Sequence, residues 1–212
     1  MRSRLRLIPA LVLVLASLGF GARPAAAAED IQGDIRTAVS VTRAFWASHW
    51  YDYFRVRYLP PRVLGGYNGY SPNRPACGGQ PLRPYNAGYC AAGHYIAWDV
   101  NLMRLGYEYG DGWIYHVIAH EWGHAVQANL PPGLHWGRLE LQADCFAGAA
   151  LQGAADDGDL VWERGDTAEI QRILRLLSGD TPWTRPGDHG SVSQRMWAFR
   201  LGVRGGVPAC VP

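Results

Sequence analysis

Lysine is absent from this 212-residue sequence: all twenty basic residues are arginine, and eighteen acidic residues balance them. Blocks of like charge are absent as well, and the formal net charge is +2. A nucleic-acid-binding protein usually presents a basic patch to the phosphate backbone, so this charge pattern argues against a nucleic-acid partner. We attribute the exclusive use of arginine to the nucleotide composition of the source.

A hydrophobic run long enough to span a membrane is also missing. The longest apolar stretch, residues 7–20, has fourteen residues and contains Pro9, whereas a membrane-spanning helix needs about 20. Three arginines precede this stretch and an Ala-Ala-Ala sequence ending at Ala28 follows it, which is the pattern of a secretory signal peptide. We therefore expect cleavage after residue 28, in preference to an uncleaved anchor, and a secreted or extracytoplasmic location.

The mature chain, residues 29–212, is expected to form a single domain, because about 184 residues support one hydrophobic core. Loss of the leader removes four arginines and no acidic residue, which changes the formal charge from +2 to −2. We expect no stable membrane anchor once the leader is gone. The oligomeric state is left open by the sequence.

Cysteine is scarce, with four residues in the chain. An even number of cysteines in an exported protein favours disulfides over free thiols. Of the three ways to pair Cys77, Cys90, Cys145 and Cys210, we favour Cys77–Cys90, because these two flank a Gly- and Pro-rich loop with few other means of becoming ordered. This choice leaves Cys145–Cys210 as the second predicted disulfide.

The segment 113–129, WIYHVIAHEWGHAVQAN, is typical of a helix and contains an HExxH motif. On a helix, His120 and His124 lie one turn apart on nearly one face, so both imidazoles can reach one metal ion. Glu121 is rotated by about 100° from His120, which places its carboxylate beside the metal as a candidate general base. Catalytic zinc sites usually add a third protein ligand and keep one position open.

A second helix supplies that third ligand. Residues 130–134, LPPGL, cannot continue the first helix, and helical composition resumes at residue 138, so two antiparallel helices are expected. Glu140 in the first turn is predicted to bind the metal, and Asp144, four residues later on the same face, to orient a ligand imidazole. His116 is predicted not to bind zinc, because its direction diverges from that of His124 by about 80°.

These residues resemble the glutamate zincins, in which HExxH is followed by E-x-x-x-D on the next helix. More narrowly, HEWGHAVQ followed by RLELQADCFAG is similar to the neutral zinc metallopeptidase family of bacteria. The resemblance includes ACG at 76–78, YC and IAWD between 89 and 99, and His189-Gly190-Ser191 with Gln194-Arg195. It departs from the family pattern at Ala125, where a second histidine is frequent, and the connection between the two helices is short.

The resemblance implies a secreted peptidase with one zinc ion per chain and a peptide or protein substrate. His120, His124 and Glu140 would hold the metal, Glu121 would act as general base, and His189 at the cleft would donate a hydrogen bond to the oxyanion of the tetrahedral intermediate. The fold class expected is α+β, mainly α: a zincin-like single domain with antiparallel active-site helices and a small sheet.

Other elements are predicted from periodicity and capping. Residues 30–53 place apolar side chains along one helical stripe, and further helices are expected from Asp166 and from Ser191, where Gln194 completes a capping box. Residues 94–100, HYIAWDV, alternate as in a strand. In the zincin arrangement such a strand offers its edge to an extended peptide, and the alternative is an ordinary sheet strand.

Trp46 and Trp50 on the first helix could pack in the core or form a carbohydrate platform, and core packing fits better.

For function, the alternatives to a peptidase are a zinc-stabilised scaffold or binding protein of the cell envelope and an amidase that acts on a non-protein amide. Glu121 argues against the scaffold, because a closed structural site would need a fourth protein ligand and no base.

Overall fold

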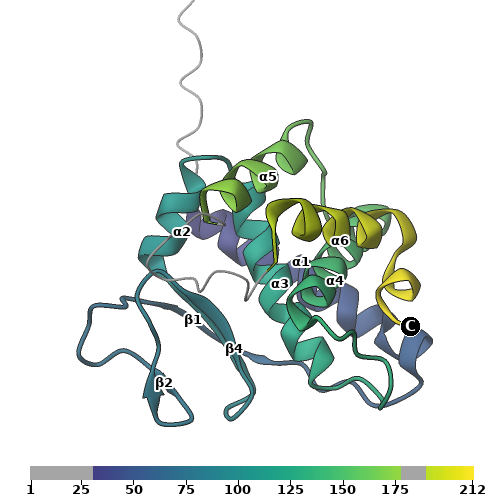
Figure 1. The fold of residues 1–212 in the computed structure, drawn as a ribbon, viewed down its shortest axis with the longest axis horizontal. Helices are drawn as coiled ribbons and strands as arrows, with labels where there is room; N and C mark the ends of the chain where they lie inside the picture. The colour runs from purple at the N-terminus through teal and green to yellow at the C-terminus, as the bar shows by residue number, and fades with distance from the viewer. Residues whose placement is uncertain (1–30, 178–189) are drawn as a thin grey trace, which may run out of the picture.

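Two antiparallel helices, α3 (Gly112–Gln127) and α4 (Leu139–Asp156), form the centre of the computed structural model, which describes residues 31–177 and 190–212 (Figure 1). As predicted, a Pro- and Gly-containing connection separates them. The helices approach closely at Gly123, where an added Cβ atom would lie 2.8 Å from the carbonyl oxygen of Ala143. The glycine inside the HExxH motif therefore allows α4 to bring its carboxylates to the two histidines.

The first described helix, α1 (Ile31–Phe54), packs against both α3 and α4. Trp46 and Trp50 on this helix are 0% and 1% exposed. The Trp46 ring lies 5.8 Å from the Phe146 ring on α4 in an edge-on arrangement, a favourable geometry for aromatic pairs. The predicted core role of the two tryptophans is confirmed.

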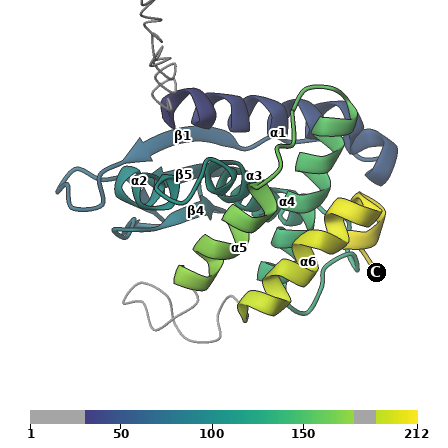
Figure 2. The same ribbon diagram turned by 90° about the horizontal axis from the view of Figure 1, so that it is seen from above.

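Figure 2 shows α1 on one side of the α3–α4 pair and α5 (Asp166–Leu177) and α6 (Val192–Gly205) on the other side. The predicted capping box at the start of α6 is present: Gln194 donates its backbone N–H to the Ser191 hydroxyl, and its side chain accepts from the Ser191 backbone N–H. α6 packs along α4, and a short 3₁₀ helix, η1 (Val207–Cys210), follows it.

A three-stranded sheet lies beside the helices, in the order β1 (Arg62–Tyr67), β5 (Tyr95–Asp99), β4 (Ala87–Cys90). β1 runs parallel to β5, and β4 runs antiparallel to it, with Ala87 opposite Trp98 and Cys90 opposite Tyr95. The predicted strand is therefore present at residues 95–99. The prediction that this strand offers a free edge to a peptide is wrong, because β5 is the central strand and both of its edges are hydrogen-bonded. The alternative, an ordinary sheet strand, is what the structure shows.

Three short elements of this region were not predicted. β2 (Ala76–Cys77) and β3 (Gln80–Pro81) form a small hairpin, and α2 (Val100–Tyr107) follows β5 without a loop. Asp99 makes that abrupt transition possible, because its side chain accepts a hydrogen bond from the backbone N–H of Asn101 at 3.0 Å and caps the helix.

Both predicted disulfides are present, Cys77–Cys90 and Cys145–Cys210. The first joins the β2–β3 hairpin to β4, and the second joins the C-terminal turn to α4. Disulfides of this kind are typical of an oxidising, extracellular environment. The described helices include none with the length and apolar character needed to cross a membrane. The observed class, α+β and mainly helical, agrees with the prediction.

Candidate metal centre

The structure brings His120 and His124 of α3 together with Glu140 of α4. The Nε2 atom of His120 lies 3.2 Å from one Glu140 oxygen, and the Nε2 atom of His124 lies 3.5 Å from the other. Ligand atoms of the three side chains all lie within 4.8 Å of one another. Two imidazole nitrogens and a carboxylate can hold a metal ion at this point.

The Nδ1 atoms of both histidines face away from Glu140 and have acceptors of their own. His120 Nδ1 lies 2.8 Å from Asp144 Oδ1, and His124 Nδ1 lies 2.8 Å from Gln127 Oε1. A histidine that donates from Nδ1 keeps its Nε2 lone pair for a metal. Asp144, predicted to orient a ligand imidazole, lies beside His120, and Gln127 was not assigned a role from the sequence.

Asp144 is fully buried and is held by Arg195 from α6. The guanidinium donates from Nε to Oδ2 at 2.8 Å and from Nη2 to Oδ1 at 2.9 Å. Burial alone would raise the pKa of Asp144, but Arg195 and His120 outweigh it and hold that pKa well below its usual range. Sequence reasoning noted Arg195 only as part of a resemblance. Its position beside Met196, on the inward face of a predicted helix, was the available signal.

The two histidines are basic in the metal-free site. Burial lowers the pKa of His120, but Asp144 and Glu140 outweigh burial and raise it to about 10. The pKa of His124 is also raised, because hydrogen bonding to Glu140 and nearby carboxylates exceed the effect of burial. A metal ion at Nε2 would therefore have to displace protons from these rings.

His116 is the one nearby histidine that was predicted not to be a ligand. It is 1% exposed, and neither ring nitrogen has a hydrogen-bond partner, although Nε2 lies 3.4 Å from Asp144 Oδ1. Burial lowers its pKa to about 3, so the ring is neutral. His116, His120 and Asp144 also lie close enough to share a cation. The Arg195 guanidinium on both Asp144 oxygens opposes a second positive charge there.

A cleft of about 530 Å³ opens onto the His120–His124–Glu140 group. Its walls come from α3, from the start of α4, from the connection between them and from β4, and include Asn86, Ala87, Gly88, Tyr89, Glu121, Gln127, Ala128, His135 and Leu139. β4 is an edge strand, and in the described part of the chain no further strand pairs with its outer side. The strand edge at the cleft thus belongs to β4 and not to β5.

Glu121 lies in this cleft and is 7% exposed. Its charge contributes to the raised pKa of His124, so the two side chains are near neighbours. A carboxylate beside the imidazoles and in the wall of the cleft lies where a water molecule could contact it. His189, the other predicted catalytic residue, lies outside the described residues.

Comparison of the chain with protein-family models, with curated proteins and with solved structures finds no match.

Proposed function

We propose that this protein is a secreted zinc metallopeptidase with a zincin-like active site, similar to the neutral zinc metallopeptidases. The observation that carries the proposal is the convergence of His120, His124 and Glu140 at one end of a cleft that also contains Glu121. Three ligands next to an accessible cleft match a catalytic zinc site, which keeps one position for water or substrate.

The donor chemistry fits zinc. Two imidazole nitrogens and one carboxylate form a donor set typical of this borderline metal, and each imidazole is fixed through Nδ1 by a separate partner. Zinc bound there would polarise the scissile carbonyl and make a water molecule nucleophilic near neutral pH. We expect one zinc ion per chain.

The protein's own groups account for the remaining steps. Glu121 would accept the proton of the attacking water and deliver it to the departing amine. The outer edge of β4 would hold an extended peptide through backbone hydrogen bonds, which demand little of the substrate sequence. Asp144, fixed by Arg195, would keep His120 in its ligand orientation.

The variant Glu121→Gln tests this proposal. The amide nearly matches the carboxylate in size, so zinc binding and folding should be retained, but it cannot take the proton at neutral pH. Peptide turnover should fall by about 10⁴-fold, the upper end of general-base effects. Glu108→Gln is the matched control, because Glu108 is exposed at the end of α2, and it should leave turnover unchanged.

Zinc content, thermal stability and cleavage of a mixed peptide library, read by mass spectrometry, should be measured on the wild type and both variants. Wild-type turnover by zinc-loaded Glu121→Gln would remove Glu121 as the base. If the wild type cleaves no peptide in a chelator-sensitive way, the peptidase assignment fails, and the scaffold or amidase alternative replaces it.

A further inference from the structure

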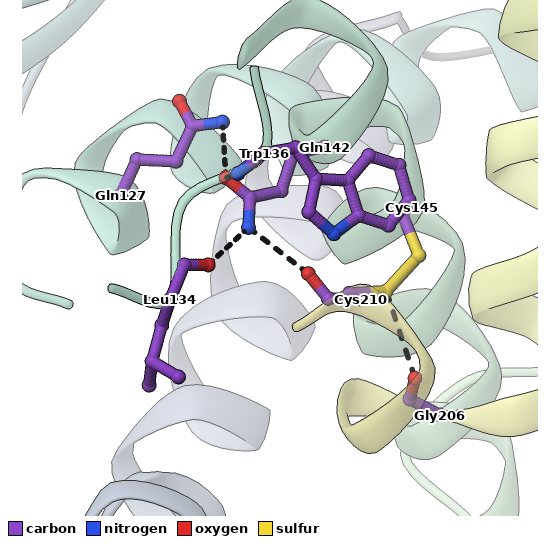
Figure 3. The surroundings of a disulfide bond; sticks show 7 residues. All are labelled: Gln127, Leu134, Trp136, Gln142, Cys145, Gly206 and Cys210. Atoms are coloured by element: carbon purple, nitrogen blue, oxygen red, sulfur yellow. Dashed lines mark hydrogen bonds between the residues drawn. A yellow bond between two sulfur atoms is a disulfide. The ribbon is translucent and has the colours of Figure 1, made fainter. Parts of the chain in front are cut away.

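Three consecutive polar groups connect His124 to the C-terminal turn of the chain. They are the side-chain amide of Gln127 on α3, the side-chain amide of Gln142 on α4 and the backbone carbonyl of Cys210 in η1 (Figure 3). Gln142 is 0% exposed and Gln127 is 5% exposed. We call this series the amide chain. Gln127 also lines the cleft, and among the described residues the side-chain amide of Gln127 bonds one ionisable group, the His124 imidazole.

The orientation of the Gln127 amide follows from its donors. Gln127 Nε2 donates to the Leu139 carbonyl at 2.6 Å and to Gln142 Oε1 at 3.2 Å. Because both of these partners are acceptors, the nitrogen must face them. The oxygen of the same amide therefore faces His124 Nδ1, at 2.8 Å, and can only accept a hydrogen bond from it.

The orientation of the Gln142 amide is fixed in the same way. Its Nε2 donates to the backbone carbonyls of Leu134, at 2.7 Å, and Cys210, at 3.0 Å. Its Oε1 accepts from Gln127 Nε2 and from the backbone N–H of Trp136 at 3.3 Å. Every partner is a backbone group or an amide already oriented, so reversing Gln142 would leave buried groups unpaired, which is costly.

The Cys210 carbonyl is itself held in place. Cys210 is fully buried and forms a disulfide with Cys145, which lies on α4 one turn after Gln142 (Figure 3). The disulfide thus fixes the acceptor at the far end of the amide chain to the helix that carries Gln142.

We propose that Gln127 and Gln142 are positioning residues that fix the tautomer of His124 in the metal-bound protein, with the proton on Nδ1 and Nε2 left to bind the metal, and that the disulfide-bonded C-terminal turn sets the direction of the amide chain. This inference rests on the proposed metal site. It gives the two ligand histidines different supports: His120 donates to a buried carboxylate, whereas His124 donates to a neutral amide that has no charge to change with pH. The Gln127 amide selects the tautomer because its fixed orientation presents an oxygen, and no N–H group, to His124 Nδ1.

The experiment uses the full mature protein with zinc, with ¹⁵N-labelled histidine, and has two readouts that do not require catalysis. Long-range ¹H–¹⁵N NMR spectra assign the tautomer of each ligand imidazole, and competition with a chromogenic chelator gives the zinc affinity. In the wild type, both ligand histidines should carry the proton on Nδ1 and bind zinc through Nε2. Gln127→Met keeps the side-chain length but removes the acceptor, so zinc affinity should fall by about 10–100-fold.

Gln152→Met is the matched control, because Gln152 lies on α4 outside the amide chain and its side chain donates a hydrogen bond to Asp156. It should bind zinc as the wild type does. In Gln127→Met, the Nδ1 proton of His124 should exchange faster with water, or the spectrum should show both tautomers of this ring. The signal of His120 should be unchanged. A general loss of stability would change the signals of both histidines and not of His124 alone.

Wild-type zinc affinity in Gln127→Met, or an equal loss in Gln152→Met, would overturn the inference. So would a wild-type spectrum in which His124 binds zinc through Nδ1, and this measurement decides the matter if Gln127→Met does not fold. Failure of the proposed function is distinguishable: a protein with both tautomers as described but no peptide hydrolysis would refute the peptidase and leave the role of the amide chain standing.

Discussion

At the scale of single residues, the candidate site separates the groups that could bind a metal ion from the groups that orient those side chains. Glu140 lies within 3.5 Å of both Nε2 atoms, whereas Asp144 contacts His120 only through Nδ1. His116 Nε2 lies 3.4 Å from Asp144 Oδ1, and neither ring nitrogen of His116 has a hydrogen bond. By distance and ring orientation, Glu140 is therefore a better candidate metal ligand than Asp144 or His116.

This ranking predicts opposite effects for two alanine substitutions. Glu140→Ala should lose most of the bound zinc, because it removes one of three ligands. His116→Ala should keep its zinc, although removal of a fully buried ring will lower stability by about 2–4 kcal/mol through the cavity it leaves. Zinc stoichiometry by atomic absorption, measured on folded protein, checks both. The reverse order of zinc contents would replace Glu140 with His116 in the ligand set.

The raised pKa of His120 predicts that zinc binding depends on pH. In the metal-free protein this ring is protonated on both nitrogens below its pKa of about 10, and His124 is shifted in the same direction. Zinc must therefore displace protons at pH 6–8, and its affinity should rise with pH by about tenfold per unit for each proton released.

Calorimetric titration with zinc in buffers of different ionisation enthalpy measures the number of protons released. We expect at least one at pH 7. An affinity that does not change between pH 6 and pH 8 would show that the rings are already neutral without the metal.

At the scale of elements, the two disulfides anchor different parts of the cleft. Cys77–Cys90 fixes the end of β4, which forms one wall, and Cys145–Cys210 fixes η1 against α4, at the far end of the amide chain. Their sequence separations are 13 and 65 residues. The longer loop should give the larger stabilisation in the chain-entropy account.

Paired alanine substitutions should separate these roles. Cys77→Ala with Cys90→Ala should lower the free energy of unfolding by about 3 kcal/mol and weaken peptide binding, seen as a raised KM. Cys145→Ala with Cys210→Ala should cost about 4 kcal/mol and also lower zinc affinity. Urea unfolding and zinc competition, done on both double variants, check this. Equal zinc affinities in the two would contradict the assignment of Cys210 to support of the site.

At the scale of the whole molecule, the His120–His124–Glu140 group lies beside a large apolar core and is not part of it. The core joins side chains from α1, α3, α4, α5 and α6, among them Trp46, Trp122 and Phe199. Such a core can hold the helices in place without an ion. A catalytic site built on this scaffold is expected to be present before the metal binds.

Removal of zinc should therefore leave the fold intact. The free energy of unfolding should fall by about 4 kcal/mol relative to protein with free zinc at a thousandfold excess over its Kd. Far-ultraviolet circular dichroism of the chelated protein should keep its helical signal. Loss of that signal on chelation would mark the zinc as structural and would favour the scaffold alternative over the peptidase.

Features that depend on neighbours within a few positions could be predicted from the residues alone. The 3.6-residue period placed His120 and His124 on one face, the Pro-Pro-Gly segment separated α3 from α4, and Ser191 with Gln194 marked the start of α6. Local backbone geometry fixes such relations, whatever the rest of the chain does.

The distant groups that support the site become visible only in the folded protein. Arg195 reaches Asp144 across 51 residues, and the Cys210 carbonyl reaches Gln142 across 68. β4, and not the more strand-like β5, forms the edge at the cleft. Helical periodicity could mark Arg195 as inward-facing, but it could not name Asp144 as the partner. These contacts depend on how α6, η1 and the sheet pack against α3 and α4, and packing is settled by the shape and volume of the whole core.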